Sequence, residues 1–212
     1  MNPSNPSGTV FIVDDDESFL RSVTRLLSAV GYQVRAFDSA MDFLDQLSPE
    51  LRGCVVADLQ MPGLNGLELQ EAVTKSANPL PIIFLSAQGD IPTTVRAMRG
   101  GAEDFLTKLS PKEKLISAIE RAMARDVTER KQRERLRDLR EQFASLTKRE
   151  MEVLGYVVRG KMNKEIADEL GINLRTVKLH RTNFTRRLQV QSVAELTRLV
   201  EEAGLFKQDK MG

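Results

Sequence analysis

The sequence predicts an α/β domain, a doubly wound five-stranded parallel sheet, joined by a long helical linker to a small all-α helix-turn-helix domain. Over residues 9–108, short apolar runs alternate with segments of helical periodicity, the pattern of a parallel sheet covered on both faces. After residue 145 only helical patterns remain. Residues 1–110 carry 8 basic and 14 acidic residues, net −6, whereas the remainder carries 23 and 16, net +7. This asymmetry favours two domains, with the basic one a candidate for nucleic-acid binding.

Composition excludes several classes of protein. A hydrophobic fraction of 41% in 212 residues supports packed cores and argues against wholesale disorder. No apolar run approaches the roughly 20 residues of a membrane span, and the first residues lack the pattern of a signal peptide. The single cysteine, Cys54, fits a reducing compartment. We therefore expect a soluble, cytoplasmic protein that does not bind a membrane, with flexible ends at 1–8 and 206–212.

Each element of the first domain follows from its local pattern. Nearly continuous apolar runs indicate buried strands, and Gly31 and Gly100-Gly101 end helical segments. The expected strands are Thr9–Val13, Gln33–Phe37, Cys54–Ala57, Leu80–Leu85 and Asp104–Leu106. The first expected helix begins near Glu17 and has apolar residues at Phe19, Val23 and Leu27. Further helices are expected over Ser39–Leu47, Asn65–Ala77 and Ile91–Met98, and another begins after Pro111.

The helix after Pro111 has no evident stop. Residues 125–142 contain no proline or glycine and are dense in arginine and glutamate, so a disordered linker is disfavoured. Val127, Leu136, Leu139 and Phe143 form only an interrupted apolar seam. We interpret this segment as a solvated helical linker, with a coiled-coil dimer seam as the alternative.

The last part of the chain, residues 143–205, predicts a helix-turn-helix. Thr147 and Glu150 have the spacing of a capping box at the start of one helix. Two further helices, Asn163–Leu170 and Leu174–Gln189, are joined by a turn of three residues that contains Gly171, with Asn173 placed to cap the second. A final helix covers Ser192–Ala203.

The helix Leu174–Gln189 contains no acidic residue. At 100° per residue, Leu174, Val177, Phe184 and Leu188 fall on one side and should pack on the core. The opposite side, which can enter a DNA major groove, carries Arg175, Lys178, Leu179, Thr182 and Arg186. Lys164 and Thr176 lie near helix starts, where phosphate contacts are expected, and His180 is a packing or phosphate-contacting residue. Arg181 points toward the apolar sector and should extend to its edge.

Polar residues end four strands of the first domain. Asp14 and Asp15 follow the first strand, Asp58 the third, Ser86 the fourth and Lys108 the fifth. The carboxyl ends of parallel strands meet at one edge of a sheet, where such folds bind ligands. Carboxylates that converge there repel, so at least one should be protonated or a cation should lie among them, and oxygen ligands suit Mg²⁺ or Mn²⁺. A metal, a lysine and a hydroxyl around one carboxylate can stabilise an incoming phosphoryl group. The acidic run Asp14–Glu17 alone could instead complement a helix N-terminus.

These residues resemble the receiver domains of bacterial two-component response regulators, which have a flavodoxin-like fold. The matching motifs are Val13-Asp14-Asp15, Asp58 to Gly63, Ser86-Ala87 and Phe105 to Lys108, within residues 9–124. The resemblance implies that Asp58 accepts phosphate from a histidine kinase. It also implies a metal held by Asp15, Asp58 and the backbone carbonyl of Gln60, with Asp14 acting through water. Ser86 and Phe105 would be a switch pair, and Lys108 would bind the phosphoryl group.

One residue departs from this family pattern. Receiver domains usually have proline after the lysine, through a cis peptide bond, but Leu109 follows Lys108 here. A cis bond before a non-proline residue costs roughly 2.5–4 kcal/mol, so we expect a trans bond. This change could re-aim Lys108 or loosen the loop, and we expect phosphorylation that is slower or less tightly coupled to output.

The second half is similar to the DNA-binding domain of LuxR-type regulators. The resemblance rests on Leu146-Thr147, Arg149-Glu150, Asn163 to Ala167 and Thr176 to Lys178 with His180. It implies dimerisation through the last helix. Both halves together resemble the FixJ/NarL class of response regulators.

The sequence therefore predicts a transcription regulator, not an enzyme, in which phosphorylation of Asp58 favours a dimerising receiver that promotes DNA binding. The expected partners are a histidine kinase, double-stranded promoter DNA, a second copy of the chain and RNA polymerase. A constitutive DNA-binding regulator with a degenerate receiver used for dimerisation is one alternative. An aspartate-nucleophile phosphohydrolase is another, but such enzymes need a second aspartate where Gln60 stands.

Overall fold

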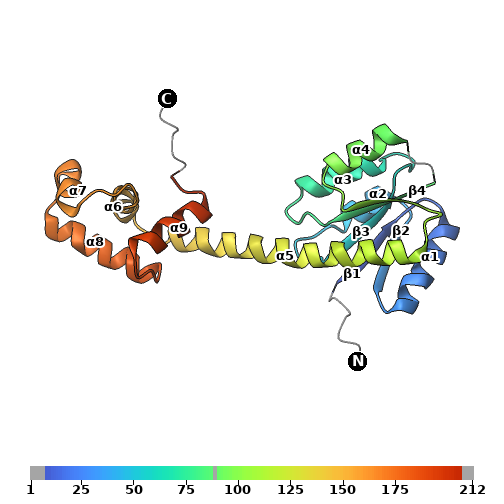
Figure 1. The fold of residues 1–212 in the computed structure, drawn as a ribbon, viewed down its shortest axis with the longest axis horizontal. Helices are drawn as coiled ribbons and strands as arrows, with labels where there is room; N and C mark the ends of the chain where they lie inside the picture. Colours follow the sequence, from blue (N-terminus) through green and yellow to red (C-terminus); the bar gives the residue numbers. More distant parts are fainter. Residues whose placement is uncertain (1–7, 88–89, 207–212) are drawn as a thin grey trace. The chain divides into compact units, whose positions relative to one another are not determined.

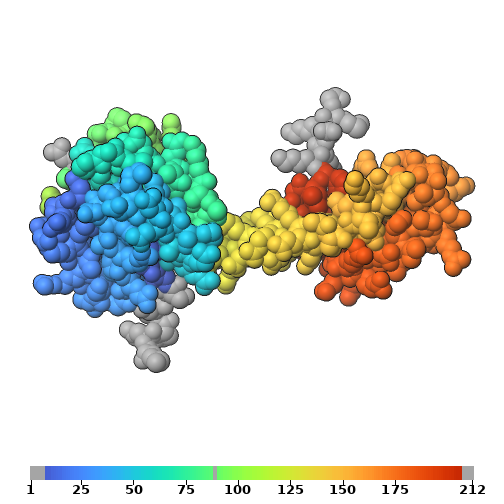
Figure 2. Space-filling view, turned by 180° about the vertical axis from the view of Figure 1, so that it is seen from behind, coloured from blue at the N-terminus to red at the C-terminus, as the bar shows by residue number. Residues whose placement is uncertain are grey.

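The computed structural model describes residues 8–87 and 90–206, and the chain divides between Arg130 and Lys131 into two compact units. Figure 1 labels elements of both units, and Figure 2 shows the first mainly in blue and green and the second in yellow, orange and red. The predicted flexible ends lie outside the described residues, except for Gly8 and Phe206. Within the described ranges, the chain contains no helix long and apolar enough to cross a membrane.

The first unit contains the predicted five-stranded sheet. All neighbouring strands pair in parallel, in the order β2-β1-β3-β4-β5. This order places β1 and β3 side by side at the centre, so residues that follow these two strands meet at one edge. The strands are β1 Thr9–Val13, β2 Gln33–Phe37, β3 Gly53–Asp58, β4 Ile82–Ser86 and β5 Asp104–Thr107.

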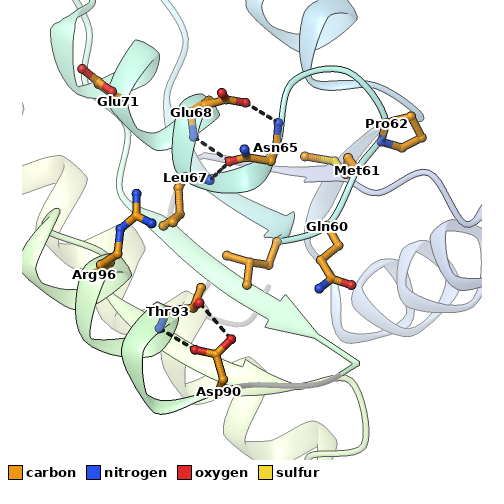
Figure 3. A pocket seen from close by; sticks show the side chains of 11 residues that line it. Gln60, Met61, Pro62, Asn65, Leu67, Glu68, Glu71, Asp90, Thr93 and Arg96 are labelled. Carbon is orange, nitrogen blue, oxygen red and sulfur yellow. Dashed lines mark hydrogen bonds between the residues drawn. The ribbon is translucent and has the colours of Figure 1, made fainter.

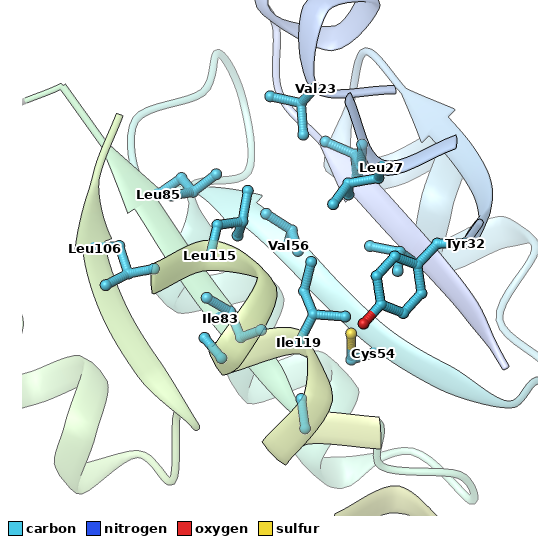
Figure 4. Close-up of a cluster of buried hydrophobic side chains, with 14 of the residues drawn as sticks. Val23, Leu27, Tyr32, Cys54, Val56, Ile83, Leu85, Leu106, Leu115 and Ile119 are labelled. Atoms are coloured by element: carbon cyan, nitrogen blue, oxygen red, sulfur yellow. The ribbon is translucent and has the colours of Figure 1, made fainter. Parts of the chain in front are cut away.

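Helices cover both faces of the sheet. Alternate residues of each central strand point to opposite faces, so β1 contributes Val10 and Ile12 to one core and Phe11 and Val13 to the other. Figure 4 shows the first core, where side chains of α1 and α5 pack on the sheet. The helices of this unit are α1 Glu17–Val30, α2 Ala40–Asp45, α3 Gly66–Lys75, α4 Ile91–Arg99 and the first part of α5 Lys112–Ala144.

The predicted elements differ from the observed ones mainly at their ends. Three predicted helix-start residues lie just outside the helix because their side chains cap it: Ser39 caps α2, Asn65 caps α3 with Glu68 in a capping box, and Ser192 caps the last helix. β4 begins two residues later than predicted and includes Ser86, which therefore belongs to the strand itself.

A buried contact joins α5 to the amino end of β3. The Gly53 N–H donates a hydrogen bond of 3.0 Å to Oδ2 of Asp126, which is buried and also lies 3.3 Å from Nη1 of Arg130. Gly53 has φ +133°, and a Cβ there would lie 1.9 Å from the carbonyl oxygen of Thr9, so only glycine fits. The strand that ends in Asp58 is therefore bonded at its other end to the helix that continues into the predicted linker.

The described residues of the second unit form the end of α5 and four further helices. Leu139 and Phe143 of α5 are buried with Val153, Phe184 and Leu196 in one core. The interpretation of residues 125–142 as a solvated linker was therefore wrong at Leu139, which packs in this core. It was also wrong at Asp126, which is buried in the first unit. The four helices are α6 Lys148–Val158, α7 Asn163–Leu170, α8 Leu174–Arg187 and α9 Val193–Ala203.

Helix α9 packs beside the last turns of α5 (Figure 1). Leu196, Val200 and Ala203 are its buried residues, and Arg135 of α5 pairs with Glu202. The side of α9 that remains exposed includes Val193, Ala194 and Arg198. The apolar side of this helix is thus used within the unit.

Candidate functional site

The side chains that end β1, β3 and β5 meet at one edge of the sheet. Asp58 is the last residue of β3, and Asp14 follows β1. Lys108, which follows β5, places its Nζ 2.9 Å from Oδ2 of Asp58 and 2.6 Å from Oδ2 of Asp14. The backbone N–H of Lys108 donates to the carbonyl of Ser86 at 2.9 Å. Four strand ends therefore contribute to one polar site, as the order of the strands requires.

Three carboxylates of this site can share a cation. One oxygen from each of Asp14, Asp15 and Asp58 lies within 4.8 Å of the others. Asp14 and Asp58 are buried and Asp15 is exposed, so the group is open to solvent on one side. Oxygen ligands on a partly open site, where water can complete the coordination, fit Mg²⁺.

The charges of the site compensate each other only in part. Burial raises the pKa of Asp14 even though Lys108 and the Asp16 N–H bond to its carboxylate. Burial by itself would lower the pKa of Lys108, but its bonds to Asp14 and Asp58 outweigh this effect and raise it. The lysine is thus held as a cation between two carboxylates.

The side chain of Asp58 is oriented by its own loop. Its Oδ1 accepts the backbone N–H groups of Leu59 at 2.6 Å and Gln60 at 3.4 Å, while Oδ2 contacts Lys108. Helix capping is performed by a different residue of the acidic run: Asp16 accepts the N–H groups of Ser18 and Phe19. The capping interpretation therefore applies to Asp16 and leaves Asp14 and Asp15 available to the site.

The predicted switch residues lie on neighbouring strands. Ser86 is buried at the end of β4, and Phe105 on β5 is half-buried, with its ring 6.2 Å from that of Phe84. Phe105 is paired in register with Phe84, two residues before Ser86. The two residues therefore lie on adjacent strands, two register positions apart, and their role as a switch stays a prediction.

The peptide bond between Lys108 and Leu109 is trans, as expected, because the described part of the chain contains no cis peptide bond. The possibility that Leu109 re-aims Lys108 is not realised, since the ammonium group contacts Asp58 and Asp14 directly. Leu109 itself is 92% exposed. The expected effect of Leu109 on phosphorylation rate remains a prediction.

A groove between α3 and α4 begins beside the site, where Gln60 and Met61 follow Asp58 (Figure 3). Its acidic side chains bond within the protein: Glu68 accepts the Asn65 N–H, and Asp90 accepts the N–H and hydroxyl of Thr93. Sequence reasoning did not predict this groove. Glu71, the third carboxylate of the lining, pairs with Lys75, so all three acidic side chains of the groove are engaged within the protein.

The second unit contains the predicted helix-turn-helix. Gly171 ends α7 with φ +61°, and Asn173 caps α8 by accepting the Arg175 N–H. The side chains expected to face DNA are exposed along one side of α8, where a shallow hollow is lined by residues of this face and of the preceding turn. The exposed residues of this face are Arg175, Lys178, Leu179, Thr182 and Arg186.

One residue of α8, Leu174, differs from the simple helical wheel, whereas Arg181 and His180 lie as expected. Leu174, expected in the core, is 42% exposed because it begins the helix beside the exposed Asn173, beyond the edge of the core. Arg181 does extend from the apolar sector, and its Nη1 donates to Oδ1 of Asn163 at 2.6 Å, which joins the two helices of the motif. His180 is half-buried, as is Thr176, while Lys164 on α7 is exposed.

Glu150 has a structural role in the second unit beyond its predicted capping box. The capping box with Thr147 is present, and the carboxylate, in a residue 3% exposed, also lies 3.2 Å from Nη1 of Arg187 on α8. Burial alone would raise the pKa of Glu150, but bonds from Thr147 and the charges of Arg187 and His180 lower it. One buried carboxylate thus fixes the start of α6 against the end of α8.

Glu150→Gln is expected to destabilise the second unit at pH 7 but to have little effect in acid. The folded pKa lies below the unfolded value of about 4.3, so the ionised carboxylate stabilises the fold above that pH. This contribution is lost as the pH falls through the lowered folded pKa. Urea unfolding followed by amide resonances of α6–α9, at several pH values from 7 to 3, measures the difference between wild type and variant. The exposed Glu152→Gln is the control, and a difference that does not depend on pH would contradict the assignment.

An acidic site at the carboxyl edge of a five-stranded parallel sheet, in one chain with a basic helix-turn-helix, defines a class of two-domain regulators. Residues 10–120 match the family described as response regulator receiver domain, and residues 144–200 match that of bacterial regulatory proteins, luxR family. The chain belongs to the response regulators that join a receiver domain to a LuxR-type DNA-binding domain.

Relatives and solved structures match this chain over nearly its whole length, across both domains. The chain is 38% identical over 198 residues to the response regulator protein TodT of Pseudomonas putida, covering 93% of this chain and 87% of TodT. It is 37% identical to the transcriptional regulatory protein FixJ of Bradyrhizobium diazoefficiens, covering 94% and 97%. Among solved structures, the response regulator StyR matches with 47% identity and TM-score 0.80, covering 92% of this chain and 98% of StyR. Full-length FixJ from B. japonicum matches with TM-score 0.56 and 37% identity, covering 94% and 98%.

Proposed function

We propose that this chain is a transcription regulator controlled by phosphorylation of Asp58 by a histidine kinase. The observation that carries the proposal is the position of Lys108, whose ammonium group lies 2.9 Å from Asp58 and 2.6 Å from Asp14 at the end of the central strands. A cation held against a carboxylate that is itself oriented by backbone N–H groups is an arrangement suited to receiving a phosphoryl group.

The proposed chemistry is a phosphoryl transfer with Asp58 as nucleophile. An oxygen of its carboxylate bonds to phosphorus while the bond from phosphorus to the kinase histidine nitrogen breaks, and that nitrogen leaves with the electron pair and takes up a proton. The product is an acyl phosphate on Asp58. Lys108 exchanges its contact with Oδ2 for one with the phosphoryl oxygens, whose negative charge it neutralises. Gln60, two residues after Asp58, has no carboxyl group that could act as the general acid or base of a phosphohydrolase.

Mg²⁺ or Mn²⁺ would supply positive charge for the phosphoryl oxygens when bound at this site. We infer that Asp15, Asp58 and the carbonyl of Gln60 hold the ion, with Asp14 contributing through water. The exposure of Asp15 supports this division: among the residues that the structure describes it has no cationic partner, so its carboxylate is available to an ion, whereas Asp14 is buried against Lys108.

Phosphorylation is proposed to favour a dimer of receivers. Ile91, Val95 and Met98 recur at i, i+4 and i+7 on α4 and are all exposed, which makes an apolar stripe on this helix. The helix follows β4, whose last residue is Ser86, so a change at the phosphorylated site can reach it through a short connection. A dimer would present two α8 helices to paired half-sites in DNA.

DNA titration with and without a small acyl-phosphate donor tests the proposal. We expect the donor to increase the affinity for a selected promoter sequence, and affinity to fall linearly with the logarithm of salt concentration because basic residues displace counterions. Titrations over a range of salt concentrations separate the two effects. Equal affinity with and without the donor, in protein shown to carry phosphate, would instead support constitutive binding.

Two variants in the same titration separate positioning from recognition. Lys164→Ala is expected to weaken binding to all sequences and to reduce the salt slope by about 1. Lys178→Ala, on the exposed face of α8, is expected to cost about 1–3 kcal/mol and to relax sequence preference. Lys114→Ala, exposed in the receiver, is the matched control. Identical sequence preference in Lys178→Ala and wild type would argue against recognition by this face.

A further inference from the structure

An aromatic ring lies against the ammonium group of Lys108. Phe19, in the first turns of α1, places the centre of its ring 4.4 Å from Nζ of Lys108. The ring is half-buried and packs against the core between α1, α5 and the sheet. Its position is thus set by the core, while one side of the ring is available to the lysine.

The loop that carries Lys108 is fastened through its backbone and its neighbours, not through Leu109. The N–H of Lys108 donates to Ser86, and the hydroxyls of Thr107 and Ser110 lie 3.0 Å apart. Leu109 is 92% exposed. These contacts hold the main chain but leave the four rotatable bonds of the lysine side chain to be ordered by what the ammonium group touches.

The ammonium group contacts two carboxylates of the site as well as the ring of Phe19. Asp14 and Asp58 attract the same charge from one side, and Phe19 presents the negative face of its ring from another. When a phosphoryl group occupies Asp58, the contact of Lys108 with Oδ2 has to be exchanged for one with phosphoryl oxygens. The contact with the ring does not have to change in that step.

We propose that Phe19 is a positioning residue that keeps the ammonium group of Lys108 beside Asp58 before and during phosphoryl transfer. The proposal rests on the proposed function of Asp58 as phosphate acceptor. It assigns to a residue of α1, five positions after Asp14, a part in the site that its apolar side chain alone would not indicate. Cation–π attraction has the strength for this role in a site where the lysine is largely shielded from water.

The rate of Asp58 phosphorylation by a small acyl phosphate tests this role in the full-length protein with Mg²⁺. Phe19→Leu keeps an apolar side chain but removes the ring, and it is expected to slow phosphorylation by about 3- to 10-fold. Phe19→Trp should retain most of the wild-type rate. Replacing Phe19 with phenylalanines of increasing fluorination weakens the negative face of the ring with little change in shape, so the logarithm of the rate should fall stepwise with fluorine number.

The position of the lysine is measured independently of phosphorylation. In wild type the ring should shift the Lys108 Cε proton resonances upfield, and Phe19→Leu should remove that shift. Phe43→Leu, in the core on the other face of the sheet, is the control for general destabilisation and should leave both the rate and the shift unchanged.

The outcomes separate this inference from the proposed function. Failure of wild type to incorporate phosphate would overturn the assignment of Asp58 and with it this inference. Normal phosphorylation of wild type and an equal rate in Phe19→Leu would overturn only the role of Phe19. The role of Phe19 would also be overturned if Phe19→Leu slowed phosphorylation but Phe19→Trp slowed it equally and the rate did not depend on the number of fluorines. That result would show that Phe19 acts only through packing.

Discussion

Asp58→Asn is expected to lower phosphate incorporation from a histidine kinase or an acyl-phosphate donor by at least about a hundredfold, because the amide is not a nucleophile. The substitution keeps the shape of a buried side chain whose Oδ1 already accepts two backbone N–H groups, so the sheet should persist. The variant should also lose the increase in DNA affinity that the donor causes in wild type. Phosphate incorporation is measured by mass spectrometry and affinity by titration at fixed salt.

Asp45→Asn is the matched control for this variant. It makes the same aspartate-to-asparagine change at an exposed position at the end of α2, away from the strand ends. Phosphate-stimulated DNA binding that persists in Asp58→Asn would show that another group accepts the phosphate. A large shift of the receiver between its two states requires much free energy: raising the dimerising state from 1% to 99% of the population needs about 5.5 kcal/mol. Loss of the acceptor should therefore return the protein to its unphosphorylated affinity.

Phe143→Ala is expected to destabilise the DNA-binding unit by about 3–5 kcal/mol, the cost of removing a large buried ring and leaving a cavity. Phe143 is 3% exposed and belongs to α5, yet it packs with Val153, Phe184 and Leu196 of the second unit. Since whole domains are stable by only about 5–15 kcal/mol, much of this unit's stability should be lost. Hydrogen exchange of the full-length chain should show faster exchange in α6–α9 and unchanged protection in β3.

Leu136→Ala, on the same helix but half-buried, is the control and should cost roughly 1 kcal/mol. Phosphorylation of Asp58 should proceed in both variants because the sheet is not involved. If Phe143→Ala left the exchange of α6–α9 unchanged, the end of α5 would not belong to the core of the DNA-binding unit.

Much of the fold could be predicted because neighbouring residues encode it. The apolar runs of β1 and β3, the glycine that ends α7 and the capping box of α6 each depend on residues a few positions apart, and the structure confirms them. The ends of elements were less accurate, since a capping residue such as Ser39 lies outside the helix that it starts. The prediction that Leu174 packs in the core was wrong for a related reason, because a helical wheel does not show where the core ends.

The candidate site was predicted less completely than the fold. Strand ends and motifs identified Asp14, Asp15, Asp58, Ser86 and Lys108, because parallel strands must deliver their carboxyl ends to one edge. The sequence carried no signal for Phe19, whose helical spacing indicated only a core residue. A pattern can show that a side chain faces the core, but not which charged group from another strand reaches its ring.

The sequence by itself determined the class of this protein: an acidic parallel-sheet receiver followed by a basic helix-turn-helix, with the order of the polar strand ends. Only the tertiary structure decided how these parts are held. Lys108 and Asp58 are 50 residues apart in the chain, and Gly53 and Asp126 are 73 apart. Leu139 and Phe143 join a core formed by later helices. Such contacts depend on where packing brings distant segments together, and local periodicity carries no record of that.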